Sequence, residues 1–336
     1  MSTQRRVLVI GPVFHGYTAT IGQALTARGH RVTTHAYDAR SGILARARTK
    51  VVEELPELVG VTTWPTTQRR ATAAAVAAVR DVRPHLVLAV KADVLTTDFW
   101  DAARGVGATT HLWLYDELHR MRLDSDVLGA VDVVTSYSKH DTATLSARGI
   151  PATHVANGFD ARLGWRPVPS DDVLFVGARY PNRERLLVEL RRRGVPVRAV
   201  GRDWSGHPWD RLRTWDPRRP DVPGERDVSR SKGYGMMAGA AANLNIHYDQ
   251  DGFTMRTFEI PGTGGLQLVD RPDVAELYAP GEEVLVYADV DEAADLAARA
   301  VRDRSWARRI GGAGRRRTLA DHTMDHRVAE LERLWA

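Results

Sequence analysis

The sequence contains no cysteine, and this absence excludes disulfide bonds, zinc sites made of thiolates, and cysteine nucleophiles. It also lacks any apolar run near the ~20 residues that a membrane-spanning helix needs. The first six residues are polar and lead directly into the apolar residues 7–10, which predicts a strand, whereas a signal peptide would have a longer apolar region. We therefore expect a protein without a membrane span, located in the cytoplasm.

Lysine is scarce: four of the 47 basic residues are lysines, so 47 − 4 = 43 are arginines, against 42 acidic residues. The resulting formal charge of +5 would suit nucleic acid or an anionic membrane as a partner. However, the arginines are spread along the chain and are interleaved with acidic residues. The clusters at 191–193 and 315–317 fall where helices are expected to end. This distribution favours a solvated surface over a nucleic-acid-binding patch.

The 336 residues, 43% hydrophobic and 26% charged, indicate a globular protein of about two domains. Short apolar runs alternate with helical stretches, which predicts two α/β halves built on doubly wound parallel sheets. In the first half we expect strands at residues 7–10, 30–35, 60–63, 85–90, 110–115 and 131–135, and helices at 19–28 and 67–80. In the second half we expect strands at 173–177, 197–201, 266–270 and 284–287, a helix end that leads into a strand within 238–246, and helices at 183–193, 291–303 and 323–335.

The division between the halves is predicted within residues 159–172, where one glycine and two prolines occur and the periodicity is weak. We expect a first Rossmann-like domain at residues 1–160, a linker at 161–171 and a second Rossmann-like domain at 172–336. The helix at 323–335 carries an apolar stripe of residues, namely Val328, Leu331, Leu334 and Trp335. This stripe fits packing on the first domain and equally fits the core of the second.

Ligands of open α/β sheets bind beyond the carboxyl ends of the strands, so three loops are candidate sites. The first, residues 11–18, contains His15 but neither the G-x-G-x-x-G nor the G-x-x-x-x-G-K-[ST] spacing, which disfavours a dinucleotide cofactor and a P-loop. The second, which begins at Gly177, places Arg179 and Arg183 around a helix start. Backbone amides and guanidinium groups there would suit a diphosphate. The alternative is two exposed arginines on a loop.

The third loop is the most informative and lies within residues 245–265, where an acidic, glycine-containing segment leads into a short helix. A carboxylate such as that of Glu259 can accept from both hydroxyls of a ribose, and Thr254 lies where an anion would bind a helix N-terminus. The alternative is an Arg256–Glu259 pair that only stabilises a surface helix. The candidate ligand-binding residues of this stretch are His247, Asp249, Asp251, Gly252, Thr254, Met255, Arg256 and Glu259.

A nucleotide-binding half placed second, with this glutamate helix near its end, resembles the GT-B glycosyltransferases. More narrowly, the second half resembles the CgeB-like (spore maturation protein) glycosyltransferase family. The matching stretches are VLFVGARYPNR at 173–183, ANLNIH at 242–247, RTFEIPGTGG at 256–265, GEEVLVYADVD at 281–291 and HTMDHR at 322–327. The resemblance implies a GT-B fold: two Rossmann-like domains that face each other across a cleft, the last helix crossing back to the first domain. It further implies that the first domain binds the acceptor and the second binds the donor.

The activity implied by the resemblance is transfer of a sugar from a nucleoside-diphosphate sugar to a hydroxyl group of an acceptor, without a metal or a cofactor. Glu259 would hold the ribose, Arg179 and Arg183 the diphosphate, and the loop 249–256 would face the sugar and phosphates. Trp204 is a candidate for stacking on the base, although packing fits it equally, and Lys232 is a weaker candidate for phosphate binding. Gly177 belongs to the donor loop.

The sequence departs from the E-x7-E pattern usual in retaining GT-B enzymes: Glu259 fits the second glutamate, but Asp251 stands eight residues before it. The stereochemistry of transfer is therefore open. For an inverting enzyme, His15 is the candidate base and Asp116 would orient it or bind the acceptor. Two alternatives from other classes are a GT-B nucleotide-sugar epimerase, which acts on the donor alone, and a non-catalytic protein that binds nucleic acid or another partner. The base, the sugar, the acceptor and the oligomeric state are not specified by these patterns.

Overall fold

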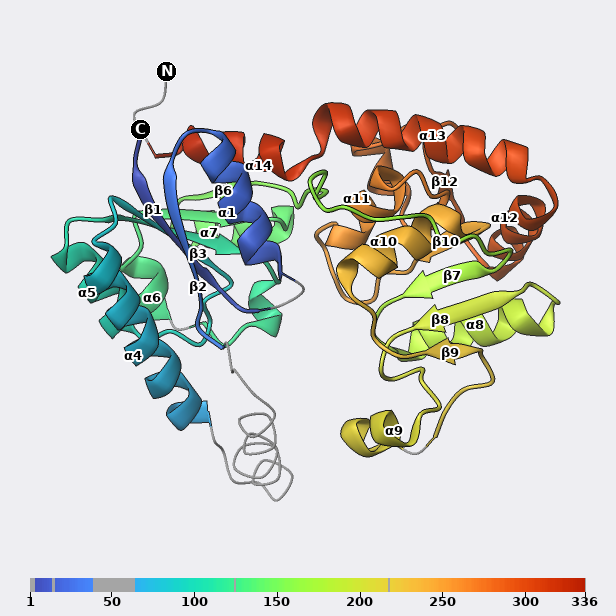
Figure 1. Cartoon of the computed structure of the whole chain (residues 1–336), viewed down its shortest axis with the longest axis horizontal. Coiled ribbons are helices and arrows are strands. Elements are labelled where there is room, and N and C mark those ends of the chain that lie inside the picture. Colours follow the sequence, from blue (N-terminus) through green and yellow to red (C-terminus); the bar gives the residue numbers. More distant parts are fainter. Residues whose placement is uncertain (1–3, 14–15, 39–63, 124, 217, 336) are drawn as a thin grey trace. The chain divides into compact units, whose positions relative to one another are not determined.

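The computed structural model describes residues 4–13, 16–38, 64–123, 125–216 and 218–335. By its internal contacts the chain divides into two compact units (Figure 1). Unit 1 comprises Met1–Ala156 together with Met324–Ala336, and unit 2 comprises Asn157–Thr323.

Unit 1 is built on a six-stranded parallel sheet with the order β2-β1-β3-β4-β5-β6. Its strands are β1 (Arg6–Gly11), β2 (Arg31–Ala36), β3 (Leu86–Val90), β4 (Thr109–Leu114), β5 (Val133–Ser136) and β6 (Ala152–His154). Its helices are α1 (Tyr17–Ala27), α4 (Trp64–Val82), α5 (Thr97–Gly105), α6 (Ser125–Gly129), α7 (Lys139–Ala147) and α14 (Met324–Glu332). The strand expected at 60–63 lies outside the described residues.

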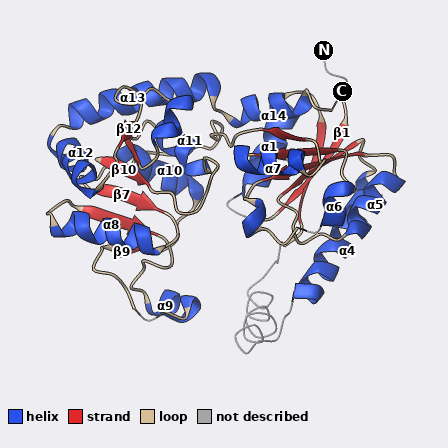
Figure 2. Ribbon diagram, turned by 180° about the vertical axis from the view of Figure 1, so that it is seen from behind, coloured by secondary structure: helices blue, strands red, loops and turns tan. Residues whose placement is uncertain are grey.

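The apolar runs explain why these strands are central. Every residue of β3 is buried, as is all of β1 except its first residue. Such strands are typical of parallel sheets covered by helices on both faces, which is the arrangement in Figure 2. The edge strand β2 instead consists of exposed and half-buried residues.

The last helix, α14, belongs to unit 1, as the GT-B resemblance implied. Val328, Leu331 and Trp335 from the expected stripe are buried, and Leu334 is half-buried. Glu332 ties the helix to the end of α1, because its carboxylate lies 2.5 Å from Arg28 Nε and 2.8 Å from His30 Nε2.

Unit 2 contains a second six-stranded parallel sheet, with the order β12-β11-β10-β7-β8-β9. Its strands are β7 (Val173–Val176), β8 (Val197–Val200), β9 (Gly224–Glu225), β10 (Ala242–Asn245), β11 (Gln267–Val269) and β12 (Leu285–Val286). Its helices are α8 (Pro181–Arg192), α9 (Pro208–Thr214), α10 (Arg230–Gly239), α11 (Met255–Gly262), α12 (Val290–Arg302) and α13 (Arg304–Asp321). The strand order reverses between β7 and β10, and this switch point is where ligands of doubly wound sheets bind.

Helix α13 is an element that the sequence pattern did not predict. The arginines at 315–317 lie inside it, so the expected helix end there is wrong, whereas those at 191–193 do lie where α8 ends. The glycines of α13 allow it to pack closely on α11 and its flanking turn. A Cβ atom on Gly311 would lie 2.4 Å from the carbonyl oxygen of Gly264. Arg315 also donates from Nη1 to the carbonyl of Gly262 at 2.9 Å, which satisfies the end of α11.

Candidate functional site

Two loops meet at the switch point of unit 2, one after β7 and one after β10. Asn182 Nδ2 donates to the carbonyl of His247 at 2.6 Å, and Arg183 Nε donates to the carbonyl of Ile246 at 2.9 Å. Arg183 Nη1 also donates to the carbonyl of Ala178 at 3.1 Å. The first turn of α8 therefore fastens the loop after β10 to the loop after β7, and Arg183 supports the backbone of the site.

Arg179 points instead toward the segment that follows β8. It forms an ion pair with Asp216, lies 3.4 Å from the carboxylate of Glu184, and donates to the carbonyl of Arg218 at 3.0 Å. Its side chain is largely buried among these groups. Arg179 thus lies in the loop after β7, as expected from its position, but its guanidinium is directed to carboxylates of the protein, which a diphosphate would have to displace.

The N-terminus of α11 lies at the same carboxyl edge of the sheet. Thr254 is extended at the N-cap, its side chain makes no capping hydrogen bond, and the first turn has no acidic residue. The first amides of a helix have no partner within the helix and carry the positive end of its dipole. The absence of a side-chain cap and of acids in this turn makes it a suitable anion site.

Glu259, one turn further along α11, is fully buried. One carboxylate oxygen accepts from the hydroxyl of Tyr234 at 3.2 Å, and the other lies 2.6 Å from Arg256 Nη1. The alternative Arg256–Glu259 pair is therefore present, but in the interior and not on a surface helix. A carboxylate has two oxygens and about four lone-pair sites, so its chemistry suits the two hydroxyls of a ribose as donors.

A buried polar layer beneath α11 was missed by the sequence analysis. Asn245 Nδ2 donates to Thr257 Oγ1 at 3.0 Å and to Gln267 Oε1 at 3.3 Å, and Asn243 Nδ2 donates to the carbonyl of Met237 at 3.0 Å. Two asparagines in a fully buried strand are costly unless they are bonded in this way. The Asn-Leu-Asn sequence of β10 was the available signal. The bond from Asn245 to Thr257 fixes α11 on the sheet, and the bond from Asn243 to Met237 holds α10 in the same way.

His247 is held by Asp270, a residue that the sequence analysis did not select. One oxygen of Asp270 accepts from the backbone N–H of His247 at 2.9 Å, and the other lies 2.8 Å from His247 Nδ1. Because a carboxylate accepts, Nδ1 carries the proton and Nε2 presents its lone pair in neutral His247. Within the described residues, Nε2 is buried without a hydrogen-bond partner. Such an oriented ring nitrogen is typical of functional sites.

Two stacked tyrosines were also missed. The rings of Tyr180 and Tyr248, which follow β7 and β10, are parallel within 7° with centroids 4.7 Å apart, and the guanidinium of Arg183 lies 4.8 Å from the ring of Tyr180. Tyr248 is 52% exposed. Trp204, in contrast, is buried, donates to the carbonyl of Gly177 at 2.9 Å and packs against Phe175. A buried indole offers no face to a base, so we leave Trp204 out of the proposed site.

The remaining candidates of unit 2 lie near this edge. The backbone of the loop 249–253 is held by Arg271, which donates to the carbonyls of Gln250 at 3.2 Å and Asp251 at 2.5 Å. Asp249 and Asp251 are exposed, Met255 is half-buried and Gly252 is buried. Lys232 is exposed in the first turn of α10, where its backbone N–H donates to the Ser229 side chain at 3.3 Å.

In unit 1, His15 lies outside the described residues. Asp116 follows β4, and its carboxylate lies 3.0 Å from Lys91 Nζ and 3.1 Å from Arg120 Nε. Lys91 and Ala92 both adopt left-handed backbone conformations, with φ of 64° and 54°. Consecutive non-glycine residues in this region are strained, and such strain is concentrated at functional sites.

Other titratable groups of unit 1 surround this turn. Burial raises the pKa of Asp93, and burial together with the neighbouring Glu117 raises the pKa of Tyr137. Perturbed carboxyl and hydroxyl groups at the carboxyl ends of strands are characteristic of binding sites. The sequence analysis selected Asp116 alone from this group.

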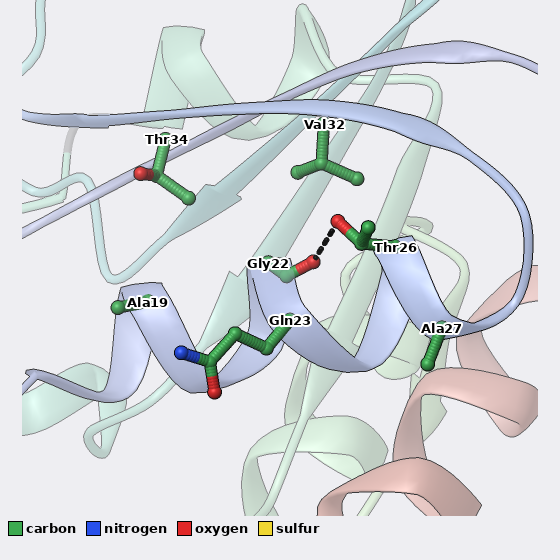
Figure 3. Close-up of a pocket in the computed structure, with 7 residues that line it drawn as sticks. All are labelled: Ala19, Gly22, Gln23, Thr26, Ala27, Val32 and Thr34. Atoms are coloured by element: carbon green, nitrogen blue, oxygen red, sulfur yellow. Dashed lines mark hydrogen bonds between the residues drawn. The ribbon is translucent and has the colours of Figure 1, made fainter.

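A separate groove in unit 1 lies between α1 and β2 (Figure 3). Its lining residues are small, apolar or uncharged polar ones, namely Ala19, Gly22, Gln23, Thr26, Ala27, Val32 and Thr34. Thr26 donates to the carbonyl of Gly22 at 2.8 Å, across the helix turn that borders the groove. Because its lining has no charged side chain, the groove is not suited to a diphosphate.

Within the residues that the structure describes, no group of three or more His, Asp or Glu side chains is placed to hold a metal ion. Over the same residues, no helix has the length and apolar character needed to cross a bilayer.

Comparison with known proteins identifies the fold class. The family described as Glycosyl transferase-like matches residues 182–333. Over 98% of its length the chain superposes on 99% of Anabaena Alr3699/HepE in complex with UDP-glucose, with a TM-score of 0.64 and 14% identity. It also superposes, over 98% of its length, on 95% of a UDP-N-acetylglucosamine 2-epimerase from Listeria monocytogenes, with a TM-score of 0.61 and 12% identity. The chain has the GT-B fold, as expected.

A curated relative narrows the resemblance. The chain is 20% identical over 274 residues to the spore protein CgeB of Bacillus subtilis (strain 168), an alignment that covers 74% of the chain and 82% of CgeB. The predicted resemblance to CgeB-like GT-B glycosyltransferases is thereby confirmed. Together, these similarities support a glycosyltransferase.

Proposed function

We propose that the protein transfers a sugar from a nucleoside-diphosphate sugar to a hydroxyl group of an acceptor. The observation that carries the proposal is the N-terminus of α11, which lies at the switch point without a side-chain cap and one turn from the buried carboxylate of Glu259. A nucleoside diphosphate has a matching pair of groups, an anion and a ribose diol. The UDP-glucose complex of HepE, a protein with this fold, supports the same class of donor.

In this proposal the diphosphate binds the first turn of α11 and the ribose hydroxyls donate to Glu259. Arg256 is the residue that changes partner. Its side chain is 27% exposed and lies beside the fully buried Glu259. On donor binding, the guanidinium would exchange the carboxylate for a phosphate group, two oxygens of which can accept from one guanidinium. The exchange uncovers Glu259 and adds a positive charge to the leaving group.

The chemical step places negative charge on the departing diphosphate. The amides of the first turn of α11 are already oriented toward this position, and Arg256 joins them when it changes partner. Such groups stabilise that charge, which is usually the largest contribution to this kind of catalysis. We propose that this stabilisation is independent of a metal ion. A chelator should then leave the transfer rate unchanged. A transfer rate that falls on chelation and recovers when Mg²⁺ is added would contradict metal independence.

The acceptor is proposed to bind unit 1 near Asp116 and the strained turn at Lys91. Asp116 is a candidate for binding an acceptor hydroxyl, since its carboxylate is held by two cations and both of its oxygens still have acceptor capacity. For an inverting reaction, His15 stays the candidate base. An acceptor that contains neighbouring hydroxyl groups would match this polar lining.

The experiment that tests the proposal follows nucleoside diphosphate release from UDP-, GDP- and TDP-sugars in the presence of a panel of hydroxyl-bearing acceptors. Release that requires an acceptor and yields a glycosylated product supports a transferase. The epimerase is the second candidate, which the Listeria structure favours, and it predicts an epimeric sugar from the donor alone. If the protein binds no donor, both proposals fail.

A further inference from the structure

An exposed aromatic face lies on the segment between β8 and β9. Trp209, Leu212 and Trp215 are 50%, 53% and 53% exposed, and their i, i+3, i+6 spacing places them on one side of α9 and its C-cap. All nine tryptophans of the chain are among the described residues, and the other seven are buried or half-buried. In unit 2, α9 lies away from the sheet (Figure 1). Large apolar side chains gathered on such an outlying helix indicate an interaction surface.

The backbone holds this face outward. Trp215 is the C-cap of α9 in the left-handed conformation, with φ of 53°, a region that disfavours residues with a side chain. Arg219 fixes the helix end from the inner side, because it donates to the carbonyl of Asp216 at 2.6 Å and to Thr214 Oγ1 at 3.0 Å. The exposed tryptophans thus lie on a segment whose backbone is held in place by hydrogen bonds.

The acidic residues of α9 and of its C-cap turn are paired within unit 2. Asp210 is buried and lies 2.8 Å from Arg226, and Asp216 is paired with Arg179, so both acids of α9 and its C-cap turn are bound toward the body of unit 2. Arg211 and Arg218 are exposed on the same segment; the Arg218 side chain is 81% exposed and lies 3.7 Å from the carboxylate of Glu184. The exposed Asp221, close to β9, lies 3.4 Å from Arg191. The solvent side of the segment therefore combines two indole rings and a leucine with positive charge.

The small area of this face favours a membrane surface over a protein as its partner. Seven residues form a helix of about 10 Å, and three side chains provide much less than the ~800 Å² per partner of a specific protein interface. A membrane surface requires no such area, because single tryptophans and leucines insert at the headgroup level while arginines bind anionic lipid heads. Positive charge beside the aromatic side chains complements an anionic headgroup layer.

We propose that α9 docks the protein on a membrane surface that contains anionic phospholipid. The segment follows the carboxyl end of β8 and is bound to Arg179 in the loop after β7, so docking would bring the edge that carries the candidate donor site toward the bilayer. The docking itself does not depend on the proposed transfer reaction.

The test is co-sedimentation of the full-length protein with vesicles of phosphatidylcholine and with vesicles of phosphatidylcholine mixed with phosphatidylglycerol. Binding is expected to the mixed vesicles and to weaken as salt is raised. The double variant Trp209→Ser/Trp215→Ser should bind at least tenfold more weakly. Arg211→Gln/Arg218→Gln should lose about fivefold for each arginine.

Leu319→Ser is the matched control, because Leu319 is an exposed apolar residue on α13, 41% exposed, and its loss should leave binding unchanged. Circular dichroism melting confirms that each variant is folded. No binding to the mixed vesicles, or equal binding by the wild type and the tryptophan variant, would overturn the proposal. So would light scattering that shows a dimer dissociated by the tryptophan substitutions, since the occupant would then be a second copy of the chain.

Discussion

Trp335 donates a hydrogen bond from its indole Nε1 to Nδ1 of His111 at 2.6 Å, which joins the end of the chain to the buried strand β4. His111 Nε2 lies 3.0 Å from Thr135 Oγ1, so both ring nitrogens have partners inside unit 1. The indole N–H can only donate, and therefore Nδ1 of His111 carries no proton and accepts this bond. The last residues of the chain are thus fixed to unit 1 by a specific polar contact as well as by an apolar stripe.

Trp335→Phe should destabilise the protein by about 1–3 kcal/mol, because His111 Nδ1 would be left buried without its donor. Chemical denaturation measures the change in the free energy of unfolding. Leu334→Ala, at a half-buried neighbour in the same turn, is the control for apolar packing alone. A Trp335→Phe protein as stable as the wild type would show that the hydrogen bond contributes nothing.

Acid should destabilise the protein through His111, whose pKa is lowered by burial to about 3. Above the unfolded pKa of about 6.5 both states are neutral and the contribution to stability is complete. Below pH ~6.5 His111 binds a proton in the unfolded chain but stays unprotonated in the native state. Its contribution to the free energy of unfolding therefore falls by about 1.4 kcal/mol per pH unit down to pH ~3.

The measurement is the free energy of unfolding from pH 7.5 to pH 4.5 for the wild type and for His111→Gln. Burial also lowers the pKa of His35 and His154, which both proteins keep, so the difference in slope isolates His111. The variant should show the shallower loss of stability on acidification. Parallel curves would contradict the assignment.

Two adjacent glycines of α13 should respond in opposite directions to alanine. Gly311→Ala places a Cβ 2.4 Å from the carbonyl of Gly264 and should cost about 1–3 kcal/mol, because backbone has to move. Gly312→Ala meets nothing closer than the end of Arg316 at 3.8 Å and should stabilise the helix by about 0.5–1 kcal/mol. Thermal unfolding of both variants checks this, and equal shifts would mean that α13 does not pack closely on the turn after α11.

The sequence predicted the fold more completely than the site. The central strands follow from local runs of apolar residues, such as the five consecutive buried residues of β3. Helix α13 was missed because Gly311, Gly312 and Gly314 are usually helix breakers, and their reason is tertiary: they allow close approach to neighbouring backbone.

The candidate site was predicted less well because its side-chain directions also depend on tertiary contacts. Motif positions located the two loops and α11, but not the direction of each side chain. Trp204 follows a glycine turn as an exposed stacking residue would, yet its indole is buried against Phe175. Asp270 and Tyr248 matter only through partners distant in sequence, His247 and Tyr180, and no local pattern marks such pairs.

Asp270→Asn should raise the KM for the donor about tenfold. An asparagine can accept only one of the two hydrogen bonds from His247, and the loss of about one bond, roughly 1.4 kcal/mol, corresponds to a factor of ten. The orientation of the ring, and with it Nε2, would no longer be fixed. Asp295→Asn, at an exposed position of α12, is the control. An unchanged KM would place His247 outside donor binding.

The central claim is that α11 binds a nucleoside diphosphate through its N-terminus and Glu259, and ligand-dependent thermal unfolding tests it most directly. At a concentration 100 times its Kd, the correct diphosphate or its sugar should stabilise the wild type by about 2.7 kcal/mol. Glu259→Gln, compared with its own unliganded state, should lose most of this stabilisation, whereas the exposed control Glu282→Gln should keep it. A wild-type protein that no diphosphate or nucleotide sugar stabilises, or a Glu259→Gln protein stabilised as strongly as the wild type, would contradict the account.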